Sequence, residues 1–141
     1  MATNSTSSRI QKTHTLVLED DVGLQVILLQ ILRRLDPEME ITWTTSARLA
    51  INKLSDKEFD LVLVDIFLDG SATGLDLIRC VETRHPYTPM VIMSGMPYDD
   101  FIKALGKKTP SSPFIPKPLD TGKCIQVLGA ALGRSPELHH Y

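Results

Sequence analysis

The amino-acid sequence predicts an α/β fold, in which a doubly wound five-stranded parallel sheet carries helices on both faces. Short apolar runs at residues 15–18, 40–43, 61–64, 90–93 and 114–115 alternate with segments of helical periodicity. The run at 61–64 contains only leucine and valine, as expected for a strand that is covered on both faces. Right-handed crossovers between successive strands leave an open parallel sheet, and five strands fit the order 2-1-3-4-5.

The first two helices are recognised by the spacing of their apolar residues and by the residues at their ends. The first is expected over residues 22–35 and ends at Asp36, because the residue before a proline avoids helical geometry. The second holds apolar residues that recur at helical spacing between 47 and 54, and either Thr45 or Ser46 can cap its start.

The third and fourth helices are placed by glycine and proline residues. A loop at 67–74, which holds two glycines, leads into the third helix, and this helix ends before Pro86. The fourth helix starts near Pro97. We expect it to end early, because Pro110 and Pro113 cannot continue a helix.

The fifth helix is capped by Asp120 or Thr121 and ends near Gly133, where the predicted domain also ends. A chain of 141 residues is near the commonest size for one domain. Its start is rich in serine, threonine and asparagine and lacks hydrophobic periodicity. The sequence therefore predicts a disordered tail over 1–12, one domain over 13–133 and a C-terminal tail over 134–141.

The bulk composition excludes several classes of protein. Apolar residues make up 43% and charged residues 23% of the chain, as in ordinary globular proteins. A formal net charge of −2 offers no basic surface for nucleic acid. No secretory signal is recognisable, and no apolar stretch is long enough to span a bilayer. We therefore expect a cytoplasmic protein that neither enters a membrane nor binds nucleic acid directly.

Four of the five predicted strands end in polar residues. Glu19 and Asp20 follow the first strand, Asp65 ends the third, Ser94 ends the fourth and Lys117 follows the fifth. In the predicted order these four strands are neighbours, and the carboxyl ends of parallel strands meet at one edge of the sheet. We therefore expect these side chains to gather there.

An acidic cluster at this edge would recruit a cation. Like charges within a few ångströms raise one another's pKa or bind a metal, and oxygen ligands with room for water suit Mg²⁺. We expect Asp20, Asp65 and the backbone carbonyl of Phe67 as direct ligands, with Glu19 acting through water. The alternative for the acidic run is that Asp20 or Asp21 merely caps the first helix.

The same edge offers the parts of a phosphoryl-transfer site. A metal-bound carboxylate such as Asp65 can act as a nucleophile toward phosphorus. Lys117 would neutralise charge on the transferred oxygens, while the Ser94 hydroxyl and the Gly95 amide would donate hydrogen bonds to them. The alternative for Lys117 is a solvated surface lysine.

In this order and at these spacings, the motifs resemble the receiver domain of the two-component response-regulator family over about residues 13–133. The resemblance implies a flavodoxin-like fold similar to that of the chemotaxis regulators. It also implies a phosphoprotein in which Asp65 accepts a phosphoryl group from a histidine kinase or a histidine phosphotransfer protein. The implied cofactor is Mg²⁺. Lys117-Pro118 falls where family members usually carry a cis peptide, and Phe114 falls at the aromatic position whose rotamer follows phosphorylation.

The resemblance further implies that the fourth helix, fifth strand and fifth helix form a face that signals to a downstream protein. Two segments depart from the family pattern. The loop after Asp65 is about one residue longer than usual, and residues 107–113 replace a common turn with a proline-containing segment. How this face reports phosphorylation, and whether phosphorylation drives dimerisation, stay open.

The first helix carries two apolar stripes. One should face the sheet and consists of Leu24, Ile27, Leu28, Ile31, Leu32 and Leu35. Val22, Val26 and Leu29 lie on the opposite side, beside the acidic residues, and Arg33 extends that stripe. In the family this surface receives the phosphohistidine donor, so we predict that the second stripe docks it. Scattered surface hydrophobic residues are the alternative.

Three other functions fit these residues less well. A phosphatase of the haloacid-dehalogenase type needs a second acid two residues after the nucleophile, where this chain has Phe67. A flavodoxin needs a neutral phosphate loop after the first strand, where the acidic residues would repel the anion. A phosphorylation-independent interaction module would not need the complete acidic set and Lys117. We therefore predict a phosphoacceptor signalling domain that is not an enzyme.

Overall fold

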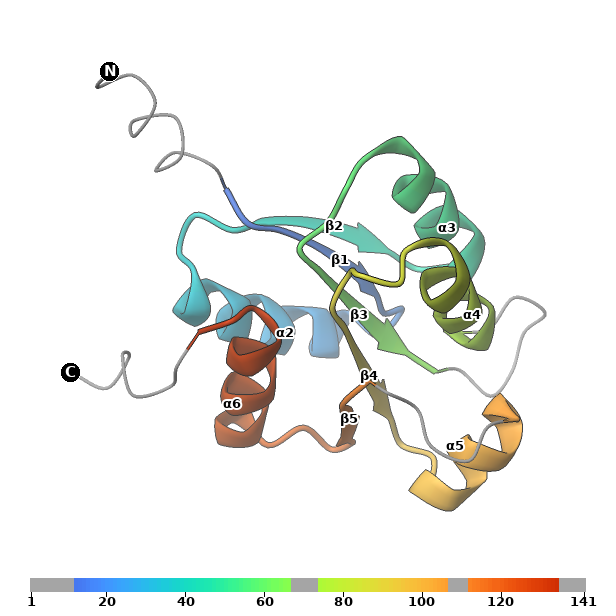
Figure 1. The fold of residues 1–141 in the computed structure, drawn as a ribbon. Helices are drawn as coiled ribbons and strands as arrows, with labels where there is room; N and C mark the ends of the chain where they lie inside the picture. The colour runs from blue at the N-terminus through green and yellow to red at the C-terminus, as the bar shows by residue number, and fades with distance from the viewer. Residues whose placement is uncertain (1–11, 67–73, 107–111, 135–141) are drawn as a thin grey trace.

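The computed structural model describes residues 12–66, 74–106 and 112–134, and these ranges form an α/β fold with one parallel sheet (Figure 1). The sheet has five strands in the order β2-β1-β3-β4-β5, and every neighbouring pair is parallel. Fold class and strand order are both confirmed. The strands are β1 (His14–Leu18), β2 (Glu40–Thr44), β3 (Leu61–Asp65), β4 (Met90–Ser94) and β5 (Phe114–Pro116).

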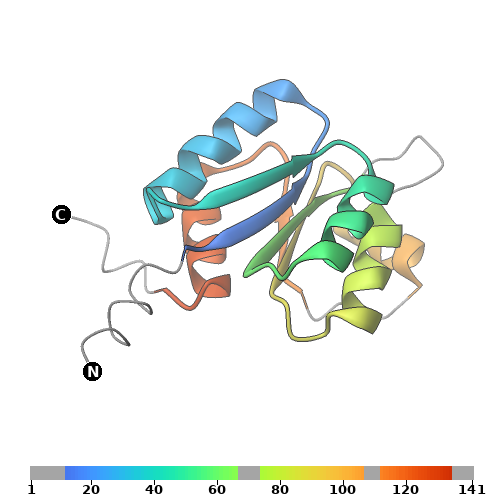
Figure 2. The same ribbon diagram turned by 90° about the horizontal axis from the view of Figure 1, so that it is seen from above.

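Helices cover both faces of this sheet. Figures 1 and 2 show α2 and α6 on one face, with α3, α4 and α5 on the other. Among the helices in the described part of the chain, none is long and apolar enough to cross a membrane. The helices are α2 (Val22–Leu35), α3 (Ala47–Asp56), α4 (Gly74–Arg84), α5 (Tyr98–Leu105) and α6 (Thr121–Ala131).

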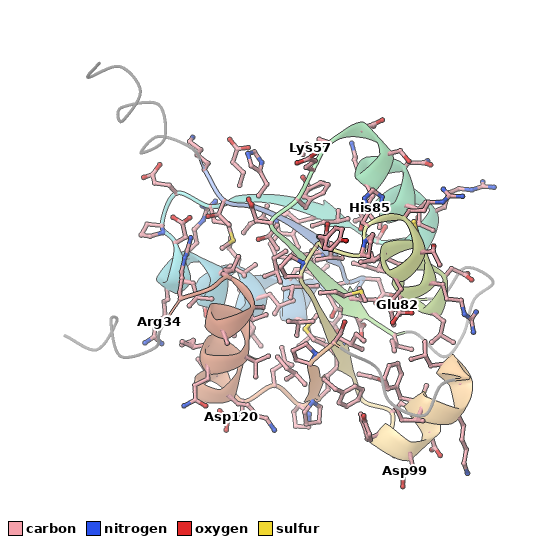
Figure 3. The ribbon with its side chains drawn as sticks, in the orientation of Figure 1. Arg34, Lys57, Glu82, His85, Asp99 and Asp120 are labelled. Atoms are coloured by element: carbon pink, nitrogen blue, oxygen red, sulfur yellow. The ribbon has the colours of Figure 1, made fainter. Side chains whose placement is uncertain are left out.

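The hydrophobic core lies in two layers, one on each side of the sheet. Residues of β3 alternate between them, since Val62 and Val64 pack with α3, α4 and α5 while Leu61 and Leu63 pack with α2 and α6. All five residues of β3 are buried. Figure 3 shows charged side chains such as Asp99 at the periphery. The buried apolar strands thus form a rigid support for the residues at their ends.

Side chains cap three of the helices. Asp21 accepts a hydrogen bond from the Leu24 amide at the start of α2, and Ser46 and Asp120 do the same at α3 and α6. Such caps satisfy amides that lack a partner in the helix. Of the predicted alternatives, Asp21 rather than Asp20 caps α2, which leaves Asp20 available at the edge of the sheet.

One helix differs in detail from the prediction, and the predicted end of another is confirmed. Ile27, predicted to face the sheet, is 40% exposed, because it lies at one margin of the apolar arc, whereas Leu28 and Leu35 lie nearer its centre and are buried. This part of the prediction is wrong. The early end of α5 is confirmed, since the helix stops at Leu105 and Gly106 adopts a left-handed φ of 79°.

The described chain ends in an arginine that is fixed to the fold. Arg134 donates hydrogen bonds to the carbonyl of Leu35 at 2.8 Å and to the hydroxyl of Thr13 at 2.9 Å. The packed part of the chain therefore extends one residue beyond the predicted boundary at Gly133. The tails predicted for residues 1–12 and 134–141 otherwise lie almost wholly outside the described residues.

Candidate functional site

The sheet brings the predicted polar residues to one edge. Asp65, the last residue of β3, pairs with Met93, and Ser94, the last residue of β4, pairs with Pro116 directly before Lys117. Glu19 follows β1, which lies on the other side of β3. Residues far apart in the sequence thus meet because parallel strands end together.

Lys117 links two buried carboxylates. Its Nζ atom lies 2.8 Å from Oδ2 of Asp65 and 3.2 Å from Oε1 of Glu19. The side chains of Asp65 and Glu19 are only 5% and 1% exposed, and that of Lys117 is 19% exposed. Lys117 is therefore part of the site, and the alternative of a solvated surface lysine is wrong.

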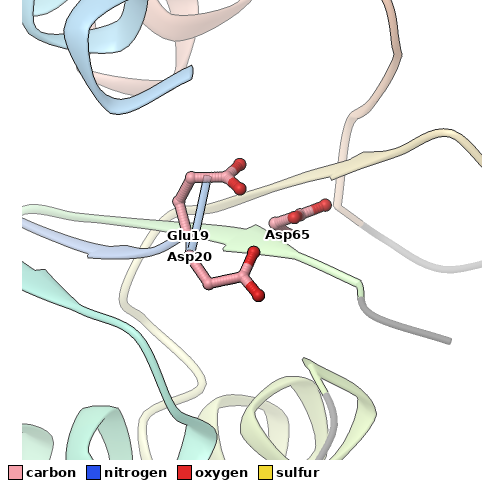
Figure 4. A group of neighbouring side chains, drawn as sticks. All are labelled: Glu19, Asp20 and Asp65. Atoms are coloured by element: carbon pink, nitrogen blue, oxygen red, sulfur yellow. The ribbon is translucent and has the colours of Figure 1, made fainter. Parts of the chain in front are cut away.

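Three carboxylates converge beside this ion pair. Glu19, Asp20 and Asp65 each place one oxygen within 4.8 Å of the others (Figure 4). Asp20 is exposed, while the other two are buried, so the cluster opens to solvent on one side. The donor set is all oxygen and carries more negative charge than one lysine balances, which fits a hard divalent cation. Phe67, predicted to add its carbonyl, lies outside the described residues.

The surroundings of Asp65 shift its carboxyl toward the neutral form when no cation is bound. Burial, opposed by the hydrogen bond from Lys117 and reinforced by the charge of Glu19, raises the pKa of the Asp65 carboxyl to about 7. Removal from water penalises the ionised carboxylate, and a like charge adds to that penalty. A cation at the cluster would act in the opposite direction and favour the ionised, nucleophilic form.

Ser94 and Gly95 lie at the adjoining strand end. Ser94 is buried, and its Oγ accepts a hydrogen bond from the Met96 amide at 2.9 Å. A hydroxyl can accept and donate together, so this bond leaves the hydroxyl proton as a donor. The Ser94 carbonyl accepts from the Lys117 amide at 2.9 Å, which ties the two strand ends together. Gly95 follows at an exposed position.

Phe114 belongs to an aromatic cluster at the start of β5. Its ring centroid lies 5.3 Å from that of Tyr98 and 5.2 Å from that of Phe101, both on α5. Tyr98 meets Phe114 edge to face and is 43% exposed. No sequence motif marks Tyr98, so its place in this cluster could not be predicted. The Lys117-Pro118 peptide is cis, as the resemblance implied.

The second apolar stripe of α2 is exposed, as predicted. Val22, Val26 and Leu29 are 71%, 51% and 37% exposed. Val22 begins the helix directly after the acidic residues, so the stripe starts beside the carboxylate cluster. Its docking role stays a prediction.

Gly74 is a further residue on which the site depends. A Cβ atom at this position would lie 2.6 Å from the Asp65 carbonyl oxygen and 3.2 Å from the Cα of Ile66. Both neighbours are backbone atoms, which cannot turn aside as a flexible side chain does. The start of α4 can therefore pack against the end of β3 only because residue 74 is glycine.

Gly74→Ala should lower the free energy of unfolding by about 1–3 kcal/mol, because the added methyl group overpacks a buried site. Denaturant unfolding of the two proteins measures the difference. Gly122→Ala is the control, since its Cβ would meet only Asp120 Oδ1 at an ordinary 3.5 Å. Equal stability of Gly74→Ala and the wild type would show that α4 does not press on the Asp65 backbone.

Comparison with known proteins yields a family and several relatives. The family model described as "Response regulator receiver domain" matches residues 15–128. The response regulator protein PilR of Pseudomonas aeruginosa is 30% identical over 131 residues, covering 91% of this chain and 28% of PilR. The regulatory protein VirG of Rhizobium rhizogenes is 26% identical over 125 residues, covering 89% of this chain and 50% of VirG. The chain thus spans half or less of the length of these relatives.

Two solved structures illustrate the likeness of the fold. The chemotaxis response regulator CheY4 of Vibrio cholerae superposes with a TM-score of 0.68 at 18% identity, covering 86% of this chain and all of CheY4. NtrX from Brucella abortus superposes with a TM-score of 0.71 at 28% identity, covering 87% of this chain and 27% of NtrX. At 18% identity, the likeness to CheY4 concerns the fold alone.

Proposed function

This chain belongs to the response regulator receiver domain family, and on that premise we propose that it is a Mg²⁺-dependent phosphoacceptor which is phosphorylated on Asp65. The observation that supports this most strongly is the contact of Lys117 with Asp65 at 2.8 Å, within a cluster of three carboxylates. A nucleophile, a cation site and an ammonium group beside the reacting oxygen are the parts that phosphoryl transfer needs.

The proposed reaction moves one phosphoryl group to a carboxylate. An oxygen of Asp65 forms a bond to phosphorus while the bond from phosphorus to the donor breaks. The electron pair of the broken bond stays on the donor nitrogen, so a phosphohistidine that is protonated at its other ring nitrogen leaves as neutral imidazole. Lys117 shifts its contact toward the transferred oxygens and offsets their charge. The Ser94 hydroxyl and the Gly95 amide donate hydrogen bonds to the same oxygens.

Glu19, Asp20 and Asp65 are the described side chains that would hold Mg²⁺. When bound, the ion would neutralise the acidic cluster and the phosphoryl oxygens together. Glu19 also accepts hydrogen bonds from the Lys117 ammonium and from the Asp21 amide, so it has partners that fix its position. Both carboxylate oxygens of Glu19 thus have a partner, Oε1 the ammonium and Oε2 the amide, which favours Asp20 and Asp65 as direct ligands, with Glu19 acting through water.

Acetyl phosphate tests this proposal without a protein donor. Incubation with and without Mg²⁺, followed by intact mass measurement, should show a gain of one phosphoryl group only with the metal. Asp65→Asn should show no gain. A phosphoryl gain in Asp65→Asn, or one that persists in a chelator, would contradict the proposal. The result also separates a phosphoacceptor from a phosphorylation-independent interaction module.

The proposed donor is a histidine kinase or a histidine phosphotransfer protein, and the exposed stripe of Val22, Val26 and Leu29 is where it would dock. Its exposed valines and leucine begin beside the carboxylate cluster, as a docking surface for the donor of the phosphoryl group requires.

Val26→Glu should slow phosphorylation by such a donor about tenfold, since it places a charge in an apolar contact. The rate with acetyl phosphate should not change. Leu49→Glu is the matched control, because Leu49 is 49% exposed on α3, on the other face of the sheet. Equal slowing of both donors by Val26→Glu would rule out a docking role.

The proposed readout runs through Phe114 and the face formed by α5, β5 and α6. Phe114 contacts Tyr98 and Phe101 of α5, so a change in its rotamer would disturb the packing of that helix. A downstream protein would recognise this face, with dimerisation as a further outcome that size measurement after phosphorylation can detect. A cytoplasmic location and no direct contact with nucleic acid are part of the same proposal.

A further inference from the structure

A glutamine of α2 holds the backbone of the acidic loop. The Gln25 side-chain amide donates a hydrogen bond of 2.7 Å from Nε2 to the carbonyl oxygen of Glu19. This bond spans six residues and joins the end of the first helical turn to the last residue before Asp20. Gln25 is half-buried, between the sheet-facing side of the helix and its exposed stripe.

Other hydrogen bonds of the loop hold Glu19 and Asp21, the two residues that flank Asp20. On one side, the Glu19 amide donates to the carbonyl of Thr44 at 3.0 Å. On the other, the Asp21 amide donates to the Glu19 carboxylate at 3.1 Å, and the Asp21 side chain caps the helix. The Gln25 contact fixes the Glu19 carbonyl, which belongs to the peptide group that leads directly into Asp20.

We propose that Gln25 is a positioning residue for the cation site, whose amide holds the Glu19 carbonyl and thereby directs the Asp20 carboxylate toward Asp65. This inference rests on the proposed function, because it assigns the loop to cation binding. Asp20 is the one exposed member of the carboxylate cluster, so packing constrains its direction least. A carboxylate of that kind depends on its backbone being held.

The choice of a neutral donor matters for this role. The amide of glutamine satisfies the carbonyl without adding charge beside three carboxylates, so it does not compete with the cation that the cluster would bind. A hydrophobic residue at the same place would leave the carbonyl to water and the loop with one bond fewer.

Gln25→Leu tests the proposal through two readouts, neither of which is phosphorylation. Titration calorimetry of the unphosphorylated protein should show about tenfold weaker Mg²⁺ binding, as is common when a group that orients a metal ligand is removed. Amide hydrogen exchange in chelator should show faster exchange of the Asp21 amide, since its partner Glu19 is less firmly held. Gln25→Asn should match Gln25→Leu, because its amide is too short to reach the carbonyl.

Gln30→Leu is the control, as it replaces an exposed glutamine of the same helix. Its Mg²⁺ affinity and Asp21 exchange should equal those of the wild type. Unchanged affinity and unchanged exchange in both Gln25 variants would overturn the positioning role. If the wild type binds no Mg²⁺, the proposed function fails, and the exchange measurement still decides whether Gln25 holds the loop.

Discussion

Lys117→Met should lower the free energy of unfolding of the metal-free protein by about 3–5 kcal/mol near pH 8, the usual cost of removing one partner of a buried ion pair. The substitution leaves Glu19 and Asp65, whose side chains are 1% and 5% exposed, without a neighbouring ammonium group. Two adjacent buried carboxylates would then repel each other in a medium of low dielectric constant. Urea unfolding in the presence of a chelator measures the loss.

Two comparisons make this result specific. Lys123→Met removes an exposed lysine of α6 and should change stability by less than about 0.5 kcal/mol. Mg²⁺ should restore more stability to Lys117→Met than to the wild type, because a cation at the cluster would replace the lost charge. A Lys117→Met protein as stable as the wild type in chelator would mean that the ion pair contributes little.

Asp65→Asn should make the metal-free protein more stable near pH 8, by about 2–4 kcal/mol, although it removes the proposed phosphoacceptor. The pKa of Asp65 is raised from its ordinary value of 3.8 to about 7 in the fold. Between these values the folded state binds more protons than the unfolded state, so wild-type stability falls as pH rises through the window. Above about pH 7 the full penalty of ionising Asp65 is present.

Asparagine has no proton to lose, so Asp65→Asn should lack this decline. Lys117 would keep its contact with Glu19 at 3.2 Å, and one buried negative charge would be gone. Unfolding curves recorded in chelator at about pH 4, 6 and 8 give the free energy of unfolding of each protein. These free energies should be nearly equal at pH 4 and should differ increasingly as the pH rises. If the free energy of unfolding depended on pH in the same way for the two proteins, burial would not raise the pKa of Asp65.

Saturating Mg²⁺ should reduce the difference in free energy of unfolding between Asp65→Asn and the wild type. The ion would bind the folded wild-type protein and stabilise it with Asp65 ionised. Mg²⁺ should stabilise Asp65→Asn less than the wild type, since one carboxylate of the cluster is missing. Stability and the proposed function would thus be opposed at this position, as is common at functional sites.

The convergence of Glu19, Asp65, Ser94 and Lys117 could be predicted from the sequence because it follows from topology. Once the apolar runs are recognised as parallel strands in this order, their last residues must share an edge. The sequence gives no comparable signal for the contact between Gln25 and the Glu19 carbonyl. A polar residue on a helix is ordinary, and only the path of the loop brings the carbonyl within its reach.

Packing details were also beyond the sequence. Ile27 fits an apolar arc on a helical wheel, but a helix on a sheet buries a narrower stripe, so its side chain is 40% exposed. The sequence places Gly74 at the end of a loop, whereas in the structure it begins α4, and its close approach to the Asp65 backbone depends on how α4 meets β3. The pairing of Tyr98 with Phe114 likewise joins two elements whose relative position no local pattern specifies.

The most direct test is to locate the phosphoryl group within the phosphorylated chain. Borohydride reduces an acyl phosphate and converts the modified aspartate to homoserine, which peptide mass analysis can assign to one position. After treatment with acetyl phosphate and Mg²⁺, the account predicts homoserine at position 65 alone. Homoserine at Asp20, or a borohydride-resistant phosphate on Ser94, would contradict the claim that Asp65 is the phosphoacceptor.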